Sequence, residues 1–436
     1  MTYDLVIHNG TIVTVNSKFE IIQSGFICIT AGEIKRIEAE DPSRPLPDAI
    51  QTIDATGGII LPGLVNTHSH LPMTLFRGLA DDIPLMKWLN EHIFPAERKH
   101  VHPGNVKSGA HLGCAEMLLS GTTTCCDGYF YEEKVAEAAS EIGIRAVAGQ
   151  GVIDFPAPGV ENPAENVDHA LGYIERWLER HPNIMPSVFC HTPYTCSDDT
   201  LKKAKEMALS KEVLFQIHVA ETRQEIEQMQ SERRMTPVKH LEQLGILDDN
   251  TLVVHGVWID EQDIAILADH GTALSHNPSS NAKLAAGIAP VPKLIEAGVT
   301  VGIGTDSCAS NNTLDLIREM NLCAKLHKAT TLDPTVLDAP RVLKMATIEG
   351  ARAIGLEKRI GSLEVGKAAD VIIIDVDKPH LTPLYNPISH LVYAASGSDV
   401  RDVIVSGKVV VRNRILQTMC LDDIMYRVNE IAKAIR

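Results

Sequence analysis

The chain lacks the features that mark secreted, membrane-spanning and nucleic-acid-binding proteins. Its N-terminus has no basic segment followed by a long apolar core, so we expect no signal peptide. No apolar run approaches the roughly 20 residues that a bilayer-spanning helix needs. Positive charge is scarce, with 40 Lys and Arg against 56 Asp and Glu and a net charge of -16. This balance argues against a binder of nucleic acid or anionic membranes, because phosphate contacts need clustered Lys and Arg.

Cysteine pairs typical of a zinc finger or a disulfide framework are also missing. The 9 Cys are odd in number and scattered, without a Cys-x-x-Cys pair. Several of them lie in apolar runs. Buried, reduced thiols in a cytoplasmic protein therefore explain the cysteines better than disulfides do.

The length and the order of apolar segments predict a barrel. A chain of 436 residues exceeds the usual limit of about 250–300 residues for one core, which favours a large domain with a smaller one. From residue 62, apolar strands alternate with helical segments, as in parallel βα folds. A doubly wound open sheet is the competing architecture, but it does not require eight similar strands. We therefore predict an α/β fold of the (β/α)₈ TIM-barrel type, with strands at 59–66, 122–126, 146–153, 187–190, 213–219, 251–254, 272–275 and 299–303.

Short strand-like segments flank the predicted barrel at both ends of the chain. Residues 1–61 contain apolar runs punctuated by turn signals, and residues 364–436 contain further runs after a turn-rich segment. Each region is too small for a good core of its own. We expect 1–61 and 364–436 to form one composite β-sandwich domain beside a hydrolase barrel over 62–363.

The first predicted barrel strand leads into His68-Ser69-His70. Alternate side chains share one face of a strand, so the two imidazoles would project together and supply half of a metal site. In a chain with 18 His, an isolated pair of this kind is more often a coincidence. The remaining strands decide between the two interpretations.

Polar residues stand where most of the other predicted strands end, as in barrel enzymes, which build their sites from these ends. The residues concerned are His191, His218, His255, His276 and Asp306. Taken singly, His191 or His276 could be a hydrogen-bonded core histidine or a strand cap, and Asp306 a helix cap. Together with the pair on the first strand, these residues supply three imidazoles and one carboxylate that suit Zn²⁺ or Fe²⁺ and leave a position for water. The four ligands are His68, His70, His218 and Asp306.

These residues, in this order on eight βα units, resemble the amidohydrolase superfamily over essentially the whole chain. Finer matches at 79–89, 94–97, 218–222, 275–281 and 304–306 are similar to the 5-methylthioadenosine/S-adenosylhomocysteine deaminases. The resemblance implies one divalent metal ion, with Zn²⁺ as the expected metal and Fe²⁺ as the alternative. It also implies hydrolytic deamination of an adenine nucleoside to the inosine analogue and ammonia, by attack of metal-activated hydroxide at C6. The expected partner is this small molecule, with a homo-oligomer left open.

The resemblance further assigns roles to single residues. Glu221 would pass a proton to ring N1 and Asp306 would carry a proton to the leaving ammonia, while His255 would hydrogen-bond the attacking water. In the family, residues matching Glu97 and His191 bind the ribose hydroxyls and the nucleoside. Trp88 would cover the ligand, although a packing role explains it equally well.

The third predicted strand departs from the family pattern. Members that accept S-adenosylhomocysteine can hold its carboxylate with arginines near this strand, whereas here Gln150 stands at that place and residues 155–168 contain no Arg or Lys. A neutral amide cannot replace a bidentate Arg–carboxylate pair. We therefore expect a preference for 5-methylthioadenosine or adenosine over S-adenosylhomocysteine.

Two other interpretations stay open at the level of the sequence. The same metal chemistry would serve a hydrolase of another ring, such as guanine or a triazine. Alternatively, the chain is a non-catalytic relative that keeps the barrel for assembly. Such relatives commonly lose metal ligands, and every expected ligand is present here.

Overall fold

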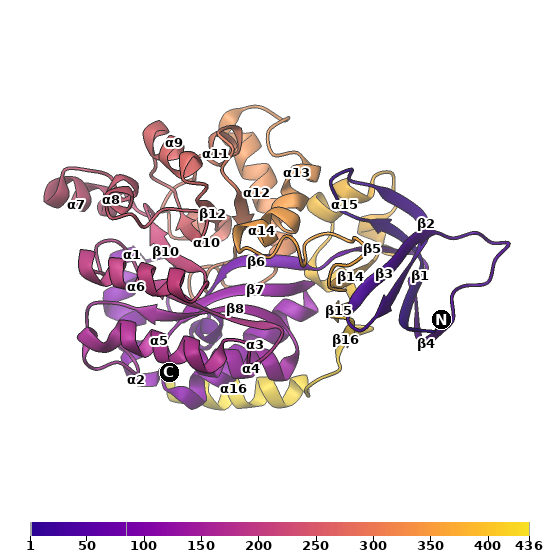
Figure 1. The fold of residues 1–436 in the computed structure, drawn as a ribbon, viewed down its shortest axis with the longest axis horizontal. Helices are drawn as coiled ribbons and strands as arrows, with labels where there is room; N and C mark the ends of the chain where they lie inside the picture. The colour runs from indigo at the N-terminus through magenta and orange to yellow at the C-terminus, as the bar shows by residue number, and fades with distance from the viewer. Residues whose placement is uncertain (1, 84, 436) are drawn as a thin grey trace.

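The computed structural model describes residues 2–83 and 85–435; Met1, Pro84 and Arg436, which fall inside ranges named above, lie outside the described residues. A barrel ringed by helices lies beside a smaller β region that holds the N-terminus (Figure 1). Within the described part of the chain, no helix is long and apolar enough to cross a membrane.

Eight parallel strands form the barrel in the order of the sequence, which confirms the predicted barrel. The sheet closes between its last and first strands, where the N–H groups of Thr305 and Asp306 donate to the carbonyl of His68 at 3.1 and 3.0 Å. Ser69 and Asp306 form an isolated bridge at the same place. The strands are β6 (Leu64–Ser69), β7 (Thr122–Tyr129), β8 (Arg145–Val152), β9 (Ile184–Cys190), β10 (Phe215–Val219), β11 (Thr251–His255), β12 (Ala273–His276) and β13 (Val301–Ile303).

Amphipathic helices cover the outside of the barrel. In α5, for example, Ala170, Tyr173, Ile174 and Trp177 are buried on one face, at the spacing of a helix that packs on a sheet. The helices from the first strand onward are α1 (Leu85–Trp88), α2 (Phe94–His100), α3 (Pro103–Leu119), α4 (Glu132–Ile142), α5 (Asn166–Trp177), α6 (Asp198–Ser210), α7 (Arg223–Arg233), α8 (Pro237–Gln243), α9 (Glu261–Asp269), α10 (Pro278–Lys283), α11 (Val291–Glu296), α12 (Leu316–Thr331), α13 (Ala339–Met345) and α14 (Ile348–Ala353). Short 3₁₀ or π segments lie at η1 (Leu71–Phe76), η2 (Leu89–Ile93), η3 (Pro163–Glu165), η4 (Pro379–Leu381) and η5 (Gly397–Asp399).

Strands from both ends of the chain build one composite β domain, as predicted. They hydrogen-bond into a single sheet of nine strands in the order β17-β16-β15-β14-β5-β1-β2-β3, with β4 paired to β1. Ile27 and Ile60 from the N-terminal part and Val371 and Ile404 from the C-terminal part share its core. The strands are β1 (Tyr3–Val13), β2 (Ile21–Thr30), β3 (Glu33–Ala39), β4 (Ala49–Asp54), β5 (Gly58–Pro62), β14 (Val371–Asp375), β15 (Val400–Val405), β16 (Lys408–Arg412) and β17 (Ile415–Leu416).

The segment 59–66, predicted as one barrel strand, is instead two strands in two different sheets. β5 pairs with β1 and β14 in the composite sheet, and β6 pairs with β7 in the barrel. Gly63 lies between them, and a Cβ at this position would stand 2.0 Å from the hydroxyl oxygen of Thr123. A continuous apolar run does not reveal which sheet accepts each half.

The range 364–436, predicted as part of the composite domain, also contains two helices that pack elsewhere. α15 (Pro387–Tyr393) packs on α12 and α13, and α16 (Leu421–Ile435) packs on α3. Figure 1 shows α16 running along the barrel helices α3 and α4. The division into a composite domain of 1–61 with 364–436 and a barrel of 62–363 therefore remains a proposal.

Candidate active site

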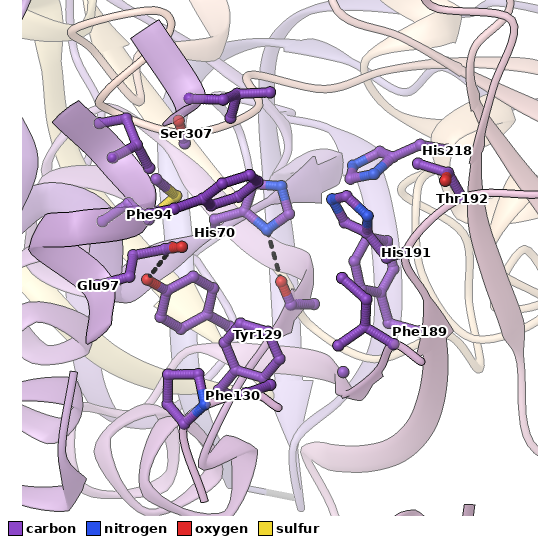
Figure 2. Close-up of a pocket in the computed structure, with 18 of the residues that line it drawn as sticks. His70, Phe94, Glu97, Tyr129, Phe130, Phe189, His191, Thr192, His218 and Ser307 are labelled. Carbon is purple, nitrogen blue, oxygen red and sulfur yellow. Dashed lines mark hydrogen bonds between the residues drawn. The ribbon is translucent and has the colours of Figure 1, made fainter. Parts of the chain in front are cut away.

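The carboxyl ends of the barrel strands surround a cavity of about 540 Å³. This volume lies within the range of about 300–1,000 Å³ that is usual for small-molecule sites. Figure 2 shows His70 between Glu97 and Tyr129 on one side and His191 and His218 on the other. The cavity is therefore lined by several of the residues that the sequence predicts to act.

The four predicted metal ligands converge at the base of this cavity. Nε2 of His68 lies 3.2 Å from Nε2 of His218, and Oδ1 of Asp306 lies 3.4 Å from Nε2 of His68 and 3.3 Å from Nε2 of His70. At bond lengths of about 2.0–2.1 Å, two ligand atoms of a tetrahedral zinc site stand roughly 3.3–3.4 Å apart. These residues fit a divalent metal.

His68 and Asp306 have the protonation states that metal binding requires, whereas His70 must lose a proton. Burial lowers the pKa of His70, but the hydrogen bond to Asp306 outweighs it and raises that pKa to about 9. Burial lowers the pKa of His68 to about 4, so its imidazole is neutral and offers a lone pair. Burial alone would raise the pKa of Asp306, but the hydrogen bonds from His68 and His70 outweigh it and hold that pKa well below its usual range. A neutral imidazole and an ionised carboxylate are the forms that bind a metal.

The segment 275–281 holds these groups in place from the neighbouring strand end. Ser280 Oγ donates to Oδ2 of Asp306 at 2.5 Å, and Ser310 Oγ donates to the same oxygen at 3.0 Å. Nδ1 of His255 lies 2.9 Å from the amide oxygen of Asn281, which can only accept. An N–H at Nδ1 of His255 would donate to this oxygen, and Nε2 of the same ring lies 4.0 Å from the carboxylate of Glu221. The sequence did not reveal these orienting roles.

Three residues at the strand ends adopt left-handed backbone conformations. Ala220, His255 and Asp306 have φ values of 54°, 76° and 59°. For residues other than glycine such conformations cost about 1–3 kcal/mol each, and they persist where the surroundings impose them. The backbone therefore turns at Ala220 after β10, at the last residue of β11, and at Asp306, three residues beyond β13.

Glu221 follows Ala220 and is held by a residue that the sequence analysis missed. Oε1 and Oε2 of Glu225 accept the N–H groups of Ala220 and Glu221 at 2.8 and 2.9 Å. The spacing Thr222-x-x-Glu225 is a helix-start signal that could have identified this carboxylate. Burial raises the pKa of Glu221, which favours its protonated form.

Glu97 lies on α2 at the opposite side of the cavity. Its Oε1 accepts a hydrogen bond of 2.6 Å from the hydroxyl of Tyr129, a second residue that the sequence analysis missed (Figure 2). Burial raises the pKa of Glu97 to about 7, against the lowering effects of Tyr129 and His70. Tyr129 thus fixes one oxygen of Glu97 and leaves the other for a ligand.

The other predicted substrate contacts divide between the cavity and the barrel wall. His191 and Trp88 line the cavity, with the indole N–H of Trp88 donating to the carbonyl of Ala80 at 3.0 Å. Gln150 is buried, and its Oε1 accepts the N–H of Glu132 at 3.2 Å. Gln150 is not among the cavity-lining residues, so the structure does not bring it to the predicted position.

One arginine does line the cavity, although not from the expected segment. Arg98 extends from α2, directly after Glu97, and its side chain is exposed. The prediction from the sequence concerned the strand around Gln150 and residues 155–168, which contain no Arg or Lys. Arg98 is thus a cation at the cavity that the prediction did not include.

Comparisons with known proteins agree with this geometry. The chain is 50% identical over 434 residues to a 5-methylthioadenosine/S-adenosylhomocysteine deaminase of Syntrophobacter fumaroxidans, covering 99% of this chain and 98% of that protein. It is 42% identical over 407 residues to a 5'-deoxyadenosine deaminase of Methanothermobacter thermautotrophicus, covering 92% and 93%. A zinc-bound adenosine deaminase crystal structure from Xanthomonas campestris superposes with a TM-score of 0.97 at 35% identity, covering 100% and 99%. Since the Amidohydrolase family model also matches residues 59–410, the chain belongs to the amidohydrolase family.

Proposed function

We propose that this protein is a metal-dependent aminohydrolase that deaminates an adenine nucleoside, 5-methylthioadenosine or adenosine, to the inosine analogue and ammonia. One observation carries the proposal: Glu97 and Glu221 line the same cavity as His70, His218 and Asp306. His68 lies directly behind them, 3.2 Å from His218 and 3.4 Å from Asp306. A proton donor, an acceptor for a diol and a metal-ligand set are the groups that this reaction needs. The names of the near-full-length relatives point to the same class of substrate.

The metal ligands in this proposal are His68, His70, His218 and Asp306, and the metal is Zn²⁺. Three imidazoles and one carboxylate suit zinc, and the similar adenosine deaminase structure contains zinc. When bound, the metal lowers the pKa of its water so that hydroxide is available near neutral pH.

Two carboxyls and one imidazole move or hold the protons. Glu221, with its raised pKa, gives a proton to ring N1 as the ring is attacked at C6. Asp306 takes the proton of the hydroxyl added at C6 and passes it to the leaving amine, so that the carbonyl forms as the amine departs as ammonia. The proton released when water becomes hydroxide restores the protonated form of Glu221. His255 forms a hydrogen bond with the attacking water through Nε2, the ring nitrogen that does not contact Asn281.

The nucleoside is bound by groups on the other walls of the cavity. Glu97 accepts hydrogen bonds from the ribose hydroxyls, which a carboxylate, as an acceptor-only group, is suited to do. His191, whose pKa burial lowers to about 4, is neutral and bonds to the nucleoside. Apolar side chains, including Ile93, Phe130 and Phe155, line the cavity and offer surface for a methylthio group.

The remaining interpretations are less favoured. A guanine or triazine hydrolase has no ribose for Glu97 to bind, and the two relatives quoted are named for adenine nucleosides. A non-catalytic assembly protein has no need for four converging metal ligands and an oriented Glu221.

Metal content and ammonia release together test the proposal. We expect about one equivalent of zinc in the active site and stoichiometric ammonia and 5-methylthioinosine from 5-methylthioadenosine. Removal of metal by a chelator should abolish turnover, and added Zn²⁺ should restore it. Turnover that survives complete metal removal, or a zinc-loaded protein that releases no ammonia from any adenine nucleoside, would contradict the proposal.

A further inference from the structure

A second cluster of metal-binding side chains lies outside the candidate active site, between the barrel and helix α12. His276 ends β12, while Cys323 and His327 stand four residues apart on α12 and so project from one face of that helix. One ligand atom from each of the three lies within 4.8 Å of the other two. The side chains are buried, at 0%, 0% and 2% exposed.

The spacing of the two imidazoles in this cluster suits two ligands of one metal ion, as well as the hydrogen bond that joins the rings without a metal. Nε2 of His276 lies 3.2 Å from Nε2 of His327, which is also the separation of His68 and His218 in the active site. A tetrahedral zinc site places two nitrogen ligands roughly 3.3–3.4 Å apart. Nδ1 of His276 is buried and has no hydrogen-bond partner among the described residues, so the surrounding protein leaves this ring incompletely satisfied.

The protonation states allow this cluster to accept a metal. Burial holds the pKa of His276 well below its usual range and lowers that of His327 to about 4, so both rings are neutral. Burial raises the pKa of the Cys323 thiol, which keeps its proton until a cation replaces it. On binding, the sulfur–hydrogen bond is exchanged for a sulfur–metal bond, and the proton passes to solvent.

We propose that His276, Cys323 and His327 form a second, structural metal site for a cation that prefers sulfur and nitrogen, namely Zn²⁺. One thiolate and two imidazoles exclude the oxygen-preferring Mg²⁺ and Ca²⁺. His276 leaves β12 toward α12, whereas the preceding Ser275 contacts Thr67 inside the barrel at 2.6 Å. The site is therefore separate from the active site, and a metal there ties α12 to the barrel wall.

Cobalt substitution distinguishes this site from the active site, because Cys323 is its sulfur ligand and the proposed active-site ligands contain no sulfur. We expect the full chain, produced with Co²⁺, to show a thiolate-to-cobalt charge-transfer band in the near ultraviolet and two metals per chain by mass spectrometry. Cys323→Ser should lose the band and one metal. Cys114→Ala, at a buried cysteine on α3, should keep both.

A wild-type protein with one metal per chain and no thiolate band overturns the second site, as does a band that survives in Cys323→Ser. If Cys323→Ser does not fold, His327→Gln serves instead, since it keeps the sulfur but removes a nitrogen ligand, and it should shift or weaken the band. The band reports on Cys323 whether or not the active site is loaded. Failure of the proposed deamination would therefore be seen independently, as metal-loaded protein without ammonia release.

Discussion

At the scale of single residues, burial and hydrogen bonding shift the pKa values of the carboxyls of one cavity in opposite directions. Burial raises the pKa values of Glu97 and Glu221, whereas Asp306, which is as deeply buried, stays ionised because two imidazoles donate to it. An enzyme separates acid from base by environments of this kind. The raised pKa suits Glu221 as a proton donor, and the depressed pKa keeps Asp306 in the ionised form that binds a metal.

Replacing Glu221 removes the proton that ring N1 needs while leaving the metal ligands intact. We expect Glu221→Gln to keep its metal content and to lower kcat about 10²–10⁴-fold. Metal per chain and the rate of ammonia release are the two measurements. Glu227→Gln, at an exposed position on α7 that pairs with Arg223, is the control and should retain wild-type turnover. Normal turnover in Glu221→Gln would refute the proton transfer.

The ionisation of Glu97 should set a pH dependence of kcat/KM for adenosine. Without a metal, the pKa of Glu97 is raised from 4.5 to about 7. A bound divalent cation lowers this pKa again, so the ionised fraction of Glu97 increases with pH between 4.5 and about 7. Because the ionised form accepts from both ribose hydroxyls, kcat/KM should rise with pH over this range. Glu97→Gln should lose this dependence and lower kcat/KM roughly 10–100-fold.

A truncated substrate provides the control for Glu97. 2'-Deoxyadenosine lacks one of the two hydroxyls, so Glu97→Gln should reduce its kcat/KM less than that of adenosine. An equal loss for both nucleosides would show that Glu97 does not bind the ribose.

At the scale of secondary-structure elements, the turn between β10 and α7 positions Glu221. Glu225 accepts two backbone N–H groups of this turn, and an alanine would leave both without a partner. Each unpaired buried group costs about 1–3 kcal/mol, so Glu225→Ala should lower the free energy of unfolding by about 2–6 kcal/mol. It should also reduce kcat, since Glu221 moves with the turn.

Denaturant unfolding and ammonia release measure these two effects. Glu225→Gln keeps one accepting oxygen in place and should recover part of the stability and part of the rate. A Glu225→Ala protein with wild-type stability would rule out this role.

The strand ends were predictable from the sequence, but the direction of each side chain was less so. His218, His255 and Asp306 directly end or follow apolar strands, and the structure brings them together because parallel strands place their carboxyl ends at one rim. The Gln150 side chain points elsewhere: its amide oxygen accepts the N–H of Glu132 at the start of α4, while the neighbouring Gly151 lines the cavity. A shift of one residue along a strand moves a side chain to the opposite face of the sheet, and the composition of the strand does not specify which residues face the cavity.

The supporting contacts were out of reach for a different reason. Tyr129 and Glu97 lie on separate elements, β7 and α2, and the pairing of Asn281 with His255 joins α10 to the end of β11. Such contacts depend on the packing of elements that are distant in sequence, which local periodicity does not specify. Likewise, the apolar run 59–66 predicts extended structure, but it does not predict that its two halves pair in two different sheets.

At the scale of the whole molecule, the cavity gathers residues from most of the barrel, and its charges decide the substrate. We expect higher kcat/KM for 5-methylthioadenosine and adenosine than for S-adenosylhomocysteine, and none for guanine. The lining is largely apolar, and the segment after β8 supplies no cation to hold an amino-acid carboxylate. A comparison of kcat/KM across the four compounds checks this preference.

Arg98 provides the sharpest control on that preference. The expected preference would be wrong if kcat/KM for S-adenosylhomocysteine equalled that for 5-methylthioadenosine. If, in addition, the S-adenosylhomocysteine activity fell in Arg98→Gln, α2 would hold the carboxylate of that substrate. Under our expectation, Arg98→Gln leaves the ratio of the two substrates unchanged.

The closure of the barrel beside Asp306 has a consequence for how the protein is made. His68 and His70 leave the ribosome early, but the strand that completes their site comes only after residue 300. At about 5–20 residues per second, this interval lasts on the order of tens of seconds. During that time the edge of β6 has no β13 to pair with. Metal capture by the full ligand set therefore becomes a late event of biosynthesis, and nascent chains released before residue 306 cannot assemble the complete site.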